Sequence, residues 1–131
     1  MPRSYVEGTW QRKNRAFSPA VITTGGRTVW AAGHGAPIDE KGGSLAGNFG
    51  AQTRQSFENL AATLKEADAT LADMVTMTVF IIDTRYGDEF VTIRREYFPD
   101  DNFPASALIT VAGFAHPDMM VEIQGIAVVD D

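Results

Sequence analysis

The sequence has no cysteine and no long hydrophobic run, and these absences exclude several classes of protein. Without cysteine the chain cannot form a disulfide scaffold or offer a thiolate nucleophile. A Cys-ligated zinc site and an iron–sulfur cluster are excluded for the same reason. No apolar stretch approaches the ~18 residues that a membrane-spanning helix needs. The polar start of the chain also lacks the hydrophobic segment of a secretory signal. We therefore expect a soluble, cytoplasmic protein with no membrane partner.

Basic residues are scarce beside acidic ones, because 11 Lys and Arg stand against 17 Asp and Glu, giving a net charge of −6. This balance disfavours a general attraction to phosphate backbones, so we expect no nucleic-acid partner. Hydrophobic residues make up 44% of the 131 residues and charged residues 21%, which is typical of a globular protein. The length predicts one domain over residues 1–131.

The first half of the chain has a polar beginning followed by β-rich runs. Residues 1–14 are polar and mixed in charge, and we interpret them as an N-terminal arm. Two β-rich runs, 21–24 and 27–32, flank Gly25-Gly26, which predicts a hairpin because primed turns need positive φ angles. Residues 33–47 are rich in glycine and are expected to form a loop.

Periodicity then predicts two helices among further strands. Apolar residues at helical spacing predict amphipathic helices over about 48–68 and 86–97, the second closed by Pro99. Strands are expected at 74–82, about 105–112 and about 120–129. The order ββαβαββ indicates an α+β domain with a mixed sheet and two helices on one face.

The strand at 74–82 has large side chains on both faces. One face would carry Val75, Met77, Val79 and Ile81, and the other Met74, Phe80 and Ile82. Two helices can cover one face of such a sheet but hardly both. We therefore expect a second subunit to bury the other face; the alternative is that the N-terminal arm closes it.

Few residues offer chemistry, and no spacing indicates a metal site, a dinucleotide site or a phosphate loop. Glu122 lies in an otherwise apolar strand and shares a strand face with Gln124. It is either a carboxylate in a cleft or part of the solvated face of an edge strand. His34 follows a strand end and is either a site residue or a surface histidine. An acid and a histidine can perform general acid–base chemistry, if they meet.

Several strings in order resemble the RidA family, also called YjgF/YER057c/UK114 and often labelled endoribonuclease L-PSP. The resemblance covers about residues 15–129 and is carried by Phe17-Ser18-Pro19-Ala20-Val21, Val29-Trp30-Ala31-Ala32-Gly33-His34, Gln52-Thr53-Arg54-Gln55, Phe103-Pro104-Ala105-Ser106 and Val121-Glu122-Ile123-Gln124-Gly125-Ile126-Ala127-Val128. It implies a chorismate-mutase-like fold, a homotrimer with pockets at the subunit interfaces, and no cofactor or metal.

Members of this family typically hydrolyse reactive imines and enamines to ketoacids and ammonia. The resemblance assigns water activation to Glu122 and retains the family's glycine as Gly33. Other positions depart from the pattern: Phe17 stands for a tyrosine, Ala32 for a serine, His34 for a glutamine, Ser106 for the arginine that binds the substrate carboxylate, and Leu108 for a frequent cysteine.

The favoured hypothesis is a RidA-like deaminase with altered specificity. Glu122 and His34 would be catalytic, and the substrate would contact Phe17, Ala32, Gly33, Ser106 and Leu108. Either His34 or Arg94 would replace the missing arginine. The alternative is a trimer that binds a small metabolite at the same pocket without catalysis. The acidic charge disfavours a third hypothesis, cleavage of RNA.

Overall fold

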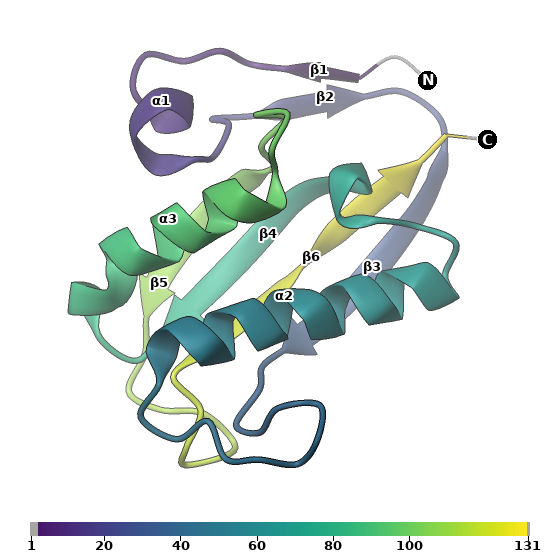
Figure 1. The fold of residues 1–131 in the computed structure, drawn as a ribbon. Coiled ribbons are helices and arrows are strands. Elements are labelled where there is room, and N and C mark those ends of the chain that lie inside the picture. Colours follow the sequence, from purple (N-terminus) through teal and green to yellow (C-terminus); the bar gives the residue numbers. More distant parts are fainter. Residues whose placement is uncertain (1–2, 131) are drawn as a thin grey trace.

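A computed structural model describes residues 3–130 and shows a mixed four-stranded sheet with helices on one face (Figure 1). The strand order is β3-β6-β4-β5, in which β4 runs parallel to β5 and antiparallel to β6, and β3 is antiparallel to β6. The bounds are β3 Arg27–His34, β4 Met74–Ile81, β5 Ala105–Thr110 and β6 Val121–Val129. The predicted α+β class is confirmed. None of the described helices is long and apolar enough to cross a membrane.

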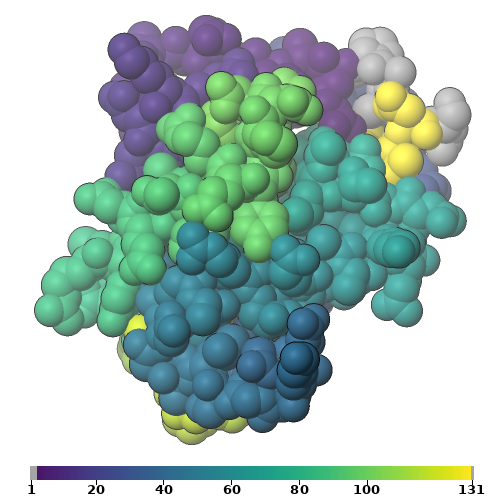
Figure 2. All heavy atoms as spheres, viewed as in Figure 1, coloured from purple at the N-terminus to yellow at the C-terminus, as the bar shows by residue number. Residues whose placement is uncertain are grey.

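Two helices, α2 (Phe49–Glu66) and α3 (Gly87–Tyr97), cover one face of this sheet. The Asn48 side chain begins α2 by accepting a hydrogen bond from the Ala51 amide at 3.0 Å. Phe57 of α2 is fully buried, and its ring packs against Phe90 of α3 at a centroid distance of 5.9 Å. The space-filling view shows the side chains of both helices over this face of the molecule (Figure 2). Both helix predictions are confirmed.

Two single-turn 3₁₀ helices, η1 (Leu71–Asp73) and η2 (Thr84–Tyr86), precede β4 and α3. In β4 the side chains of Met77, Val79 and Ile81 are buried beneath the helices. Met74 is buried with them because the pairing of β4 with β6 shifts register between Met74 and Thr76. The predicted placement of Met74 on the opposite face is therefore wrong.

The predicted N-terminal arm contains regular structure. A short strand, β1 (Arg3–Tyr5), pairs antiparallel with β2 (Val21–Thr23), and a helical turn, α1 (Gln11–Arg15), lies between them. Residues 1–2 lie outside the described residues. The arm therefore contains a strand and a helical turn, and β1 forms because β2 offers an edge with which it can pair.

The predicted hairpin around Gly25-Gly26 does not form. Both glycines have positive φ angles, 71° and 84°, as the turn prediction requires. However, β2 pairs with β1, and β3 pairs with β6 in the other sheet. The two glycines therefore turn the chain from one sheet into the other rather than back onto its neighbour.

The second face of the four-stranded sheet carries no covering helix within residues 3–130. Its side chains include Thr76, Thr78 and Phe80 of β4, and Trp30 of β3, which is 76% exposed. The arm does not close this face, because α1 contacts α3 through the Arg15–Asp88 ion pair. We call this surface the open face.

Candidate functional site

Glu122 lies on the open face near the start of the central strand β6. It is paired with Phe80 of β4, and β6 lies between β3 and β4, so the edge-strand alternative is excluded. Gln124 shares this face and is exposed, as predicted. Glu122 itself is half-buried, and no group in the described chain forms a hydrogen bond with its carboxylate. The carboxylate is therefore available to a ligand.

Gly33 lies directly against the Glu122 carboxylate. The pairing of β3 with β6 is irregular here, because Ala32 and Gly33 together lie opposite Gln124 alone. A Cβ atom on Gly33 would collide with the carboxylate of Glu122. The close approach of these two residues, rather than an unusual φ angle, is what requires glycine at this position. Gly33 and Glu122 are thus brought together, with Ala32 exposed beside them.

Glu122 lines an open cavity of about 340 Å³. Its other lining residues come from β4 and from the loop after β5: Phe80, Val111, Gly113, Phe114 and Ala115. An ionised carboxylate beside such apolar walls can accept a proton from a bound water. Within residues 3–130, no group of three or more His, Asp or Glu side chains is placed to hold a metal ion.

His34 lies on the opposite side of the sheet from Glu122. It pairs with Ile123, whose side chain is buried beneath the helices. Its Nε2 is 2.7 Å from the Thr63 hydroxyl of α2, and its Nδ1 is 2.7 Å from the carbonyl oxygen of Ala32. A carbonyl can only accept, so Nδ1 donates a proton and a neutral ring accepts at Nε2 from Thr63. Within one chain His34 and Glu122 therefore do not meet, because the extra residue in β3 turns His34 inward.

The remaining predicted residues form a second group beside the edge strand β5. Ser106 and Leu108 pair with Met77 and Val79 of β4, so they face the helix layer. Together with Phe17 they line a cavity of about 200 Å³. The other lining residues are Trp10, Arg15, Val91 and Arg94. The predicted site residues are therefore divided between two faces of the sheet.

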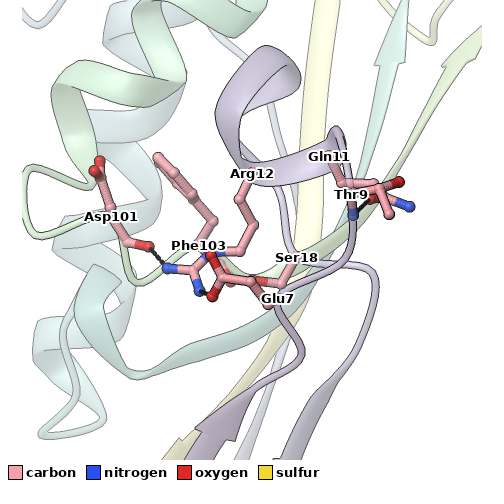
Figure 3. Close-up of polar contacts among 7 residues, drawn as sticks. All are labelled: Glu7, Thr9, Gln11, Arg12, Ser18, Asp101 and Phe103. Atoms are coloured by element: carbon pink, nitrogen blue, oxygen red, sulfur yellow. Dashed lines mark hydrogen bonds and ion pairs between the residues drawn. The ribbon is translucent and has the colours of Figure 1, made fainter.

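The N-terminal segment holds Phe17 at this second cavity through its contacts with the chain that enters β5. The buried Ser18 hydroxyl donates a hydrogen bond to the carbonyl oxygen of Phe103 at 2.6 Å. Arg12 of α1 donates to the carbonyl oxygen of Asp101, and Figure 3 shows these residues side by side. Phe17 is thereby fixed next to Ser106 although the two are distant in sequence.

Arg94 of α3 is the residue whose role the sequence left open. Its side chain is buried, with 1% exposure, and it reaches β5. Nη1 donates to the Ser106 hydroxyl at 2.6 Å, and Nη2 donates to the carbonyl oxygen of Arg15 at 3.1 Å. A guanidinium therefore contacts the residue that stands where the family has its arginine. The available signal was the helical spacing, since Arg94 follows the buried Phe90 by four residues.

The charge of Arg94 has no acidic partner in the described chain. Burial, followed by repulsion from Arg15 and Arg95, lowers the pKa of Arg94 to about 9. Its Nε has no hydrogen-bond partner among residues 3–130. The rings of Phe90 and Phe17, with centroids 5.0 and 6.0 Å from the guanidinium carbon, offer the charge some stabilisation.

Comparison with known sequences identifies clear relatives. Residues 11–129 match the family described as endoribonuclease L-PSP. A 2-iminobutanoate/2-iminopropanoate deaminase from Salmonella typhimurium is 37% identical over 97 residues, which cover 70% of this chain and 73% of that protein. A RutC family protein from Pyrococcus abyssi is 32% identical over 103 residues, covering 78% of this chain and 79% of the relative.

Solved structures give the same result. A protein of unknown function of the conserved Rid protein family from Yersinia pestis superposes with a TM-score of 0.87 at 26% identity, over 98% of this chain and 100% of that one. A structure from Thermotoga maritima has a TM-score of 0.69 at 32% identity, over 88% of this chain and 87% of that one. The chain therefore belongs to the endoribonuclease L-PSP family, which is also known as the RidA or YjgF/YER057c/UK114 family.

Proposed function

We propose that this protein is a RidA-like hydrolase that deaminates a reactive imine or enamine metabolite, with Glu122 activating the attacking water. The observation that carries the proposal is the Glu122 carboxylate, which accepts no hydrogen bond from residues 3–130 and lines a cavity of about 340 Å³ against Gly33. The name of the Salmonella relative supports an imine as the substrate class.

The reaction consumes one water and releases one ammonia. Glu122 accepts a proton from water as the water oxygen bonds to the imine carbon, and the imine nitrogen takes up a proton. In the resulting carbinolamine the nitrogen is protonated again, the C–N bond breaks, and loss of the hydroxyl proton leaves a carbonyl group. An enamine would first take a proton at carbon to become the imine. His34 is given no part in these steps, because both of its ring nitrogens are engaged within the chain, by the carbonyl oxygen of Ala32 and by the Thr63 hydroxyl.

The site is completed, in this proposal, between subunits of a homotrimer with the chorismate-mutase-like arrangement. One chain presents two separate half-sites. The Glu122 half-site consists of Gly33, Phe80, Phe114 and Glu122, and the Arg94 half-site consists of Phe17, Arg94, Ser106 and Leu108. They lie on opposite sides of the sheet, so a single substrate can contact both only if a neighbouring copy supplies one of them. The exposed Trp30 on the open face supports such a contact.

A coupled assay tests the proposal. Serine or threonine dehydratase generates the unstable enamine in solution, and ketoacid and ammonia formation are followed with and without this protein. We expect the wild-type protein to accelerate the reaction above the spontaneous rate. In Glu122→Gln this acceleration should be about 10²–10⁴-fold smaller. Gln124→Ala is the matched control, because it changes an exposed residue on the same face of the same strand. A folded wild-type protein that accelerates none of the imines tested would overturn the proposal.

A non-catalytic metabolite-binding protein remains the second candidate, favoured by the residues Phe17, Ala32 and Ser106 in place of the family's tyrosine, serine and arginine. This candidate predicts that a ligand raises the melting temperature but is not turned over. The rise should be the same in wild type and in Glu122→Gln. RNA cleavage that persists after removal of contaminating nucleases and is lost in Glu122→Gln would instead support a nuclease.

A further inference from the structure

The Arg94 half-site contains a buried charge that the described chain does not neutralise. Arginine offers five N–H donors, and Arg94 uses Nη1 for the Ser106 hydroxyl and Nη2 for the carbonyl oxygen of Arg15. Both acceptors are uncharged. A buried guanidinium without a counterion is unfavourable, and the two charged side chains that act on it most, Arg15 and Arg95, are also cations and repel it. The arrangement therefore favours an anion that comes from outside the chain.

We infer that Arg94 and Ser106 together bind the carboxylate of the substrate in the cavity of about 200 Å³ beside β5. That the bound carboxylate belongs to the substrate rests on the proposed function. That Arg94 binds a carboxylate is independent of the proposed function. The cation is thus supplied by helix α3 instead of by strand β5, where the family has its arginine.

The geometry of Ser106 suits this role. Its hydroxyl oxygen accepts from Arg94, which leaves the hydroxyl hydrogen available to a second acceptor. Among residues 3–130 its only acceptor is the carbonyl oxygen of Ala107, which lies a long 3.4 Å from the Ser106 hydroxyl oxygen. A carboxylate at this point would accept from the guanidinium and from the hydroxyl, and charge-assisted bonds of this kind are stronger than neutral ones.

The other residues that line this cavity indicate what kind of molecule carries the carboxylate. The walls are mainly apolar and include Trp10, Phe17, Val91 and Leu108, with Trp10 packed edge-on against Phe17 at 5.8 Å. Arg15, the other lining cation, is engaged by Asp88 at 2.6 Å. The half-site therefore fits a monoanion with an apolar body better than a dicarboxylate.

Direct binding of a stable probe provides the test. The probe is 2-oxobutanoate, the product anion of 2-iminobutanoate hydrolysis, and its uncharged control is 2-oxobutanamide, both measured by calorimetry. We expect wild type to prefer the anion, and Arg94→Met to bind it about 10–100-fold more weakly. Arg95→Met is the matched control and should bind as wild type does, because Arg95 donates to carbonyl oxygens of α1 and lines a different groove.

A double variant protects the test against a folding defect, since Arg94 also bonds to the end of α1. Arg94→Ser combined with Ser106→Arg exchanges two side chains that are 2.6 Å apart and returns a guanidinium to the same cavity. We expect it to recover most of the affinity that Arg94→Ser alone loses. If the double variant regains affinity and binds 2-oxobutanoate more tightly than 2-oxobutanamide, a purely structural role of Arg94 is excluded.

The outcomes separate this inference from the proposed function. Unchanged probe affinity in a folded Arg94→Met protein overturns the carboxylate site, even if imines are hydrolysed. Arg94-dependent binding of 2-oxobutanoate without any imine hydrolysis upholds the site and overturns the proposed enzyme. If both hold, Arg94→Met raises KM for the imino acid far more than it lowers kcat, whereas Glu122→Gln lowers kcat and leaves probe binding intact.

Discussion

At the scale of single residues, the contact between Gly33 and Glu122 can be tested by adding one methyl group. Gly33→Ala places a Cβ where the carboxylate now lies, so we expect the carboxylate to be displaced and turnover of the imine to fall by up to about 100-fold. The φ angle of Gly33 is not in the left-handed region, so the melting temperature should change little. Steady-state kinetics and thermal unfolding are the measurements.

A double-variant cycle identifies the cause of this loss. In a Glu122→Ala background the carboxylate is absent, and Gly33→Ala should then cause no additional loss of activity. Equal losses in both backgrounds would show that the alanine acts on something other than the carboxylate.

The lowered pKa of Arg94 sets the pH range of anion binding. Only the protonated guanidinium attracts a carboxylate, so affinity for 2-oxobutanoate should be constant from about pH 6 to about pH 8. Above the pKa of about 9 the free protein loses the proton, and affinity should fall by about tenfold per pH unit. Calorimetry at each pH, with circular dichroism to verify folding, measures this. Constant affinity to about pH 10.5 would contradict the lowered pKa.

The sequence predicted part of this site and missed part of it for definable reasons. Glu122 was singled out because it is a carboxylate in an otherwise apolar strand, Gly33 because it matches a family string, and the structure places them in contact. His34 was misplaced because one extra residue in β3 changes the direction of its side chain. The contact of Arg94 with Ser106 depends on how α3 packs against β5, which no local pattern encodes.

At the scale of secondary-structure elements, β6 can lie close to β4 only because Gly125 has no side chain. A Cβ on Gly125 would collide with the backbone carbonyl oxygen of Thr76, beside the register shift in β4. Gly125→Ala should therefore lower the free energy of unfolding by about 1–3 kcal/mol, because the strands must move apart. Gly113→Ala is the matched control, since nothing lies within 4 Å of the point that a Cβ on Gly113 would occupy. Urea unfolding of the two variants compares them; equal stabilities would contradict this account.

Helices and strands with a strong internal sequence pattern were located well from the sequence, whereas the pairing of strands was not. Helices α2 and α3 carry their own periodicity, so the sequence located both. The hairpin at Gly25-Gly26 failed because both flanking strands have better partners elsewhere in the chain. Strand pairing is decided between distant segments, whereas a turn signal is local.

At the scale of the whole molecule, mixing two inactive variants tests whether subunits share sites. Glu122→Ala chains retain Arg94, and Arg94→Met chains retain Glu122. If each site takes its halves from neighbouring subunits, random trimers of an equal mixture should contain both native residues at about one quarter of the interfaces. Co-expression should therefore restore part of the imine hydrolysis. No recovery in verified mixed trimers would indicate that one chain supplies the whole site.

The open face provides a second test at this scale. Trp30→Lys introduces a charge at a side chain that is 76% exposed in the single chain, and we expect it to disrupt the proposed trimer and reduce turnover. Ile22→Lys is the control, because Ile22 is also exposed but belongs to the two-stranded sheet. Light scattering after gel filtration measures the mass of each. A Trp30→Lys protein that remains trimeric would exclude this part of the open face from the interface.

The separation of Glu122 from Arg94 by the thickness of the sheet also has a consequence for how activity depends on dilution. A lone chain holds the carboxylate and the guanidinium in places that no small molecule can touch at once. The rate per chain would then rise with protein concentration until assembly is complete, and freshly diluted protein would lose activity at the speed of dissociation. Abundance in the cell, and not affinity for the imine alone, would decide when the protein works.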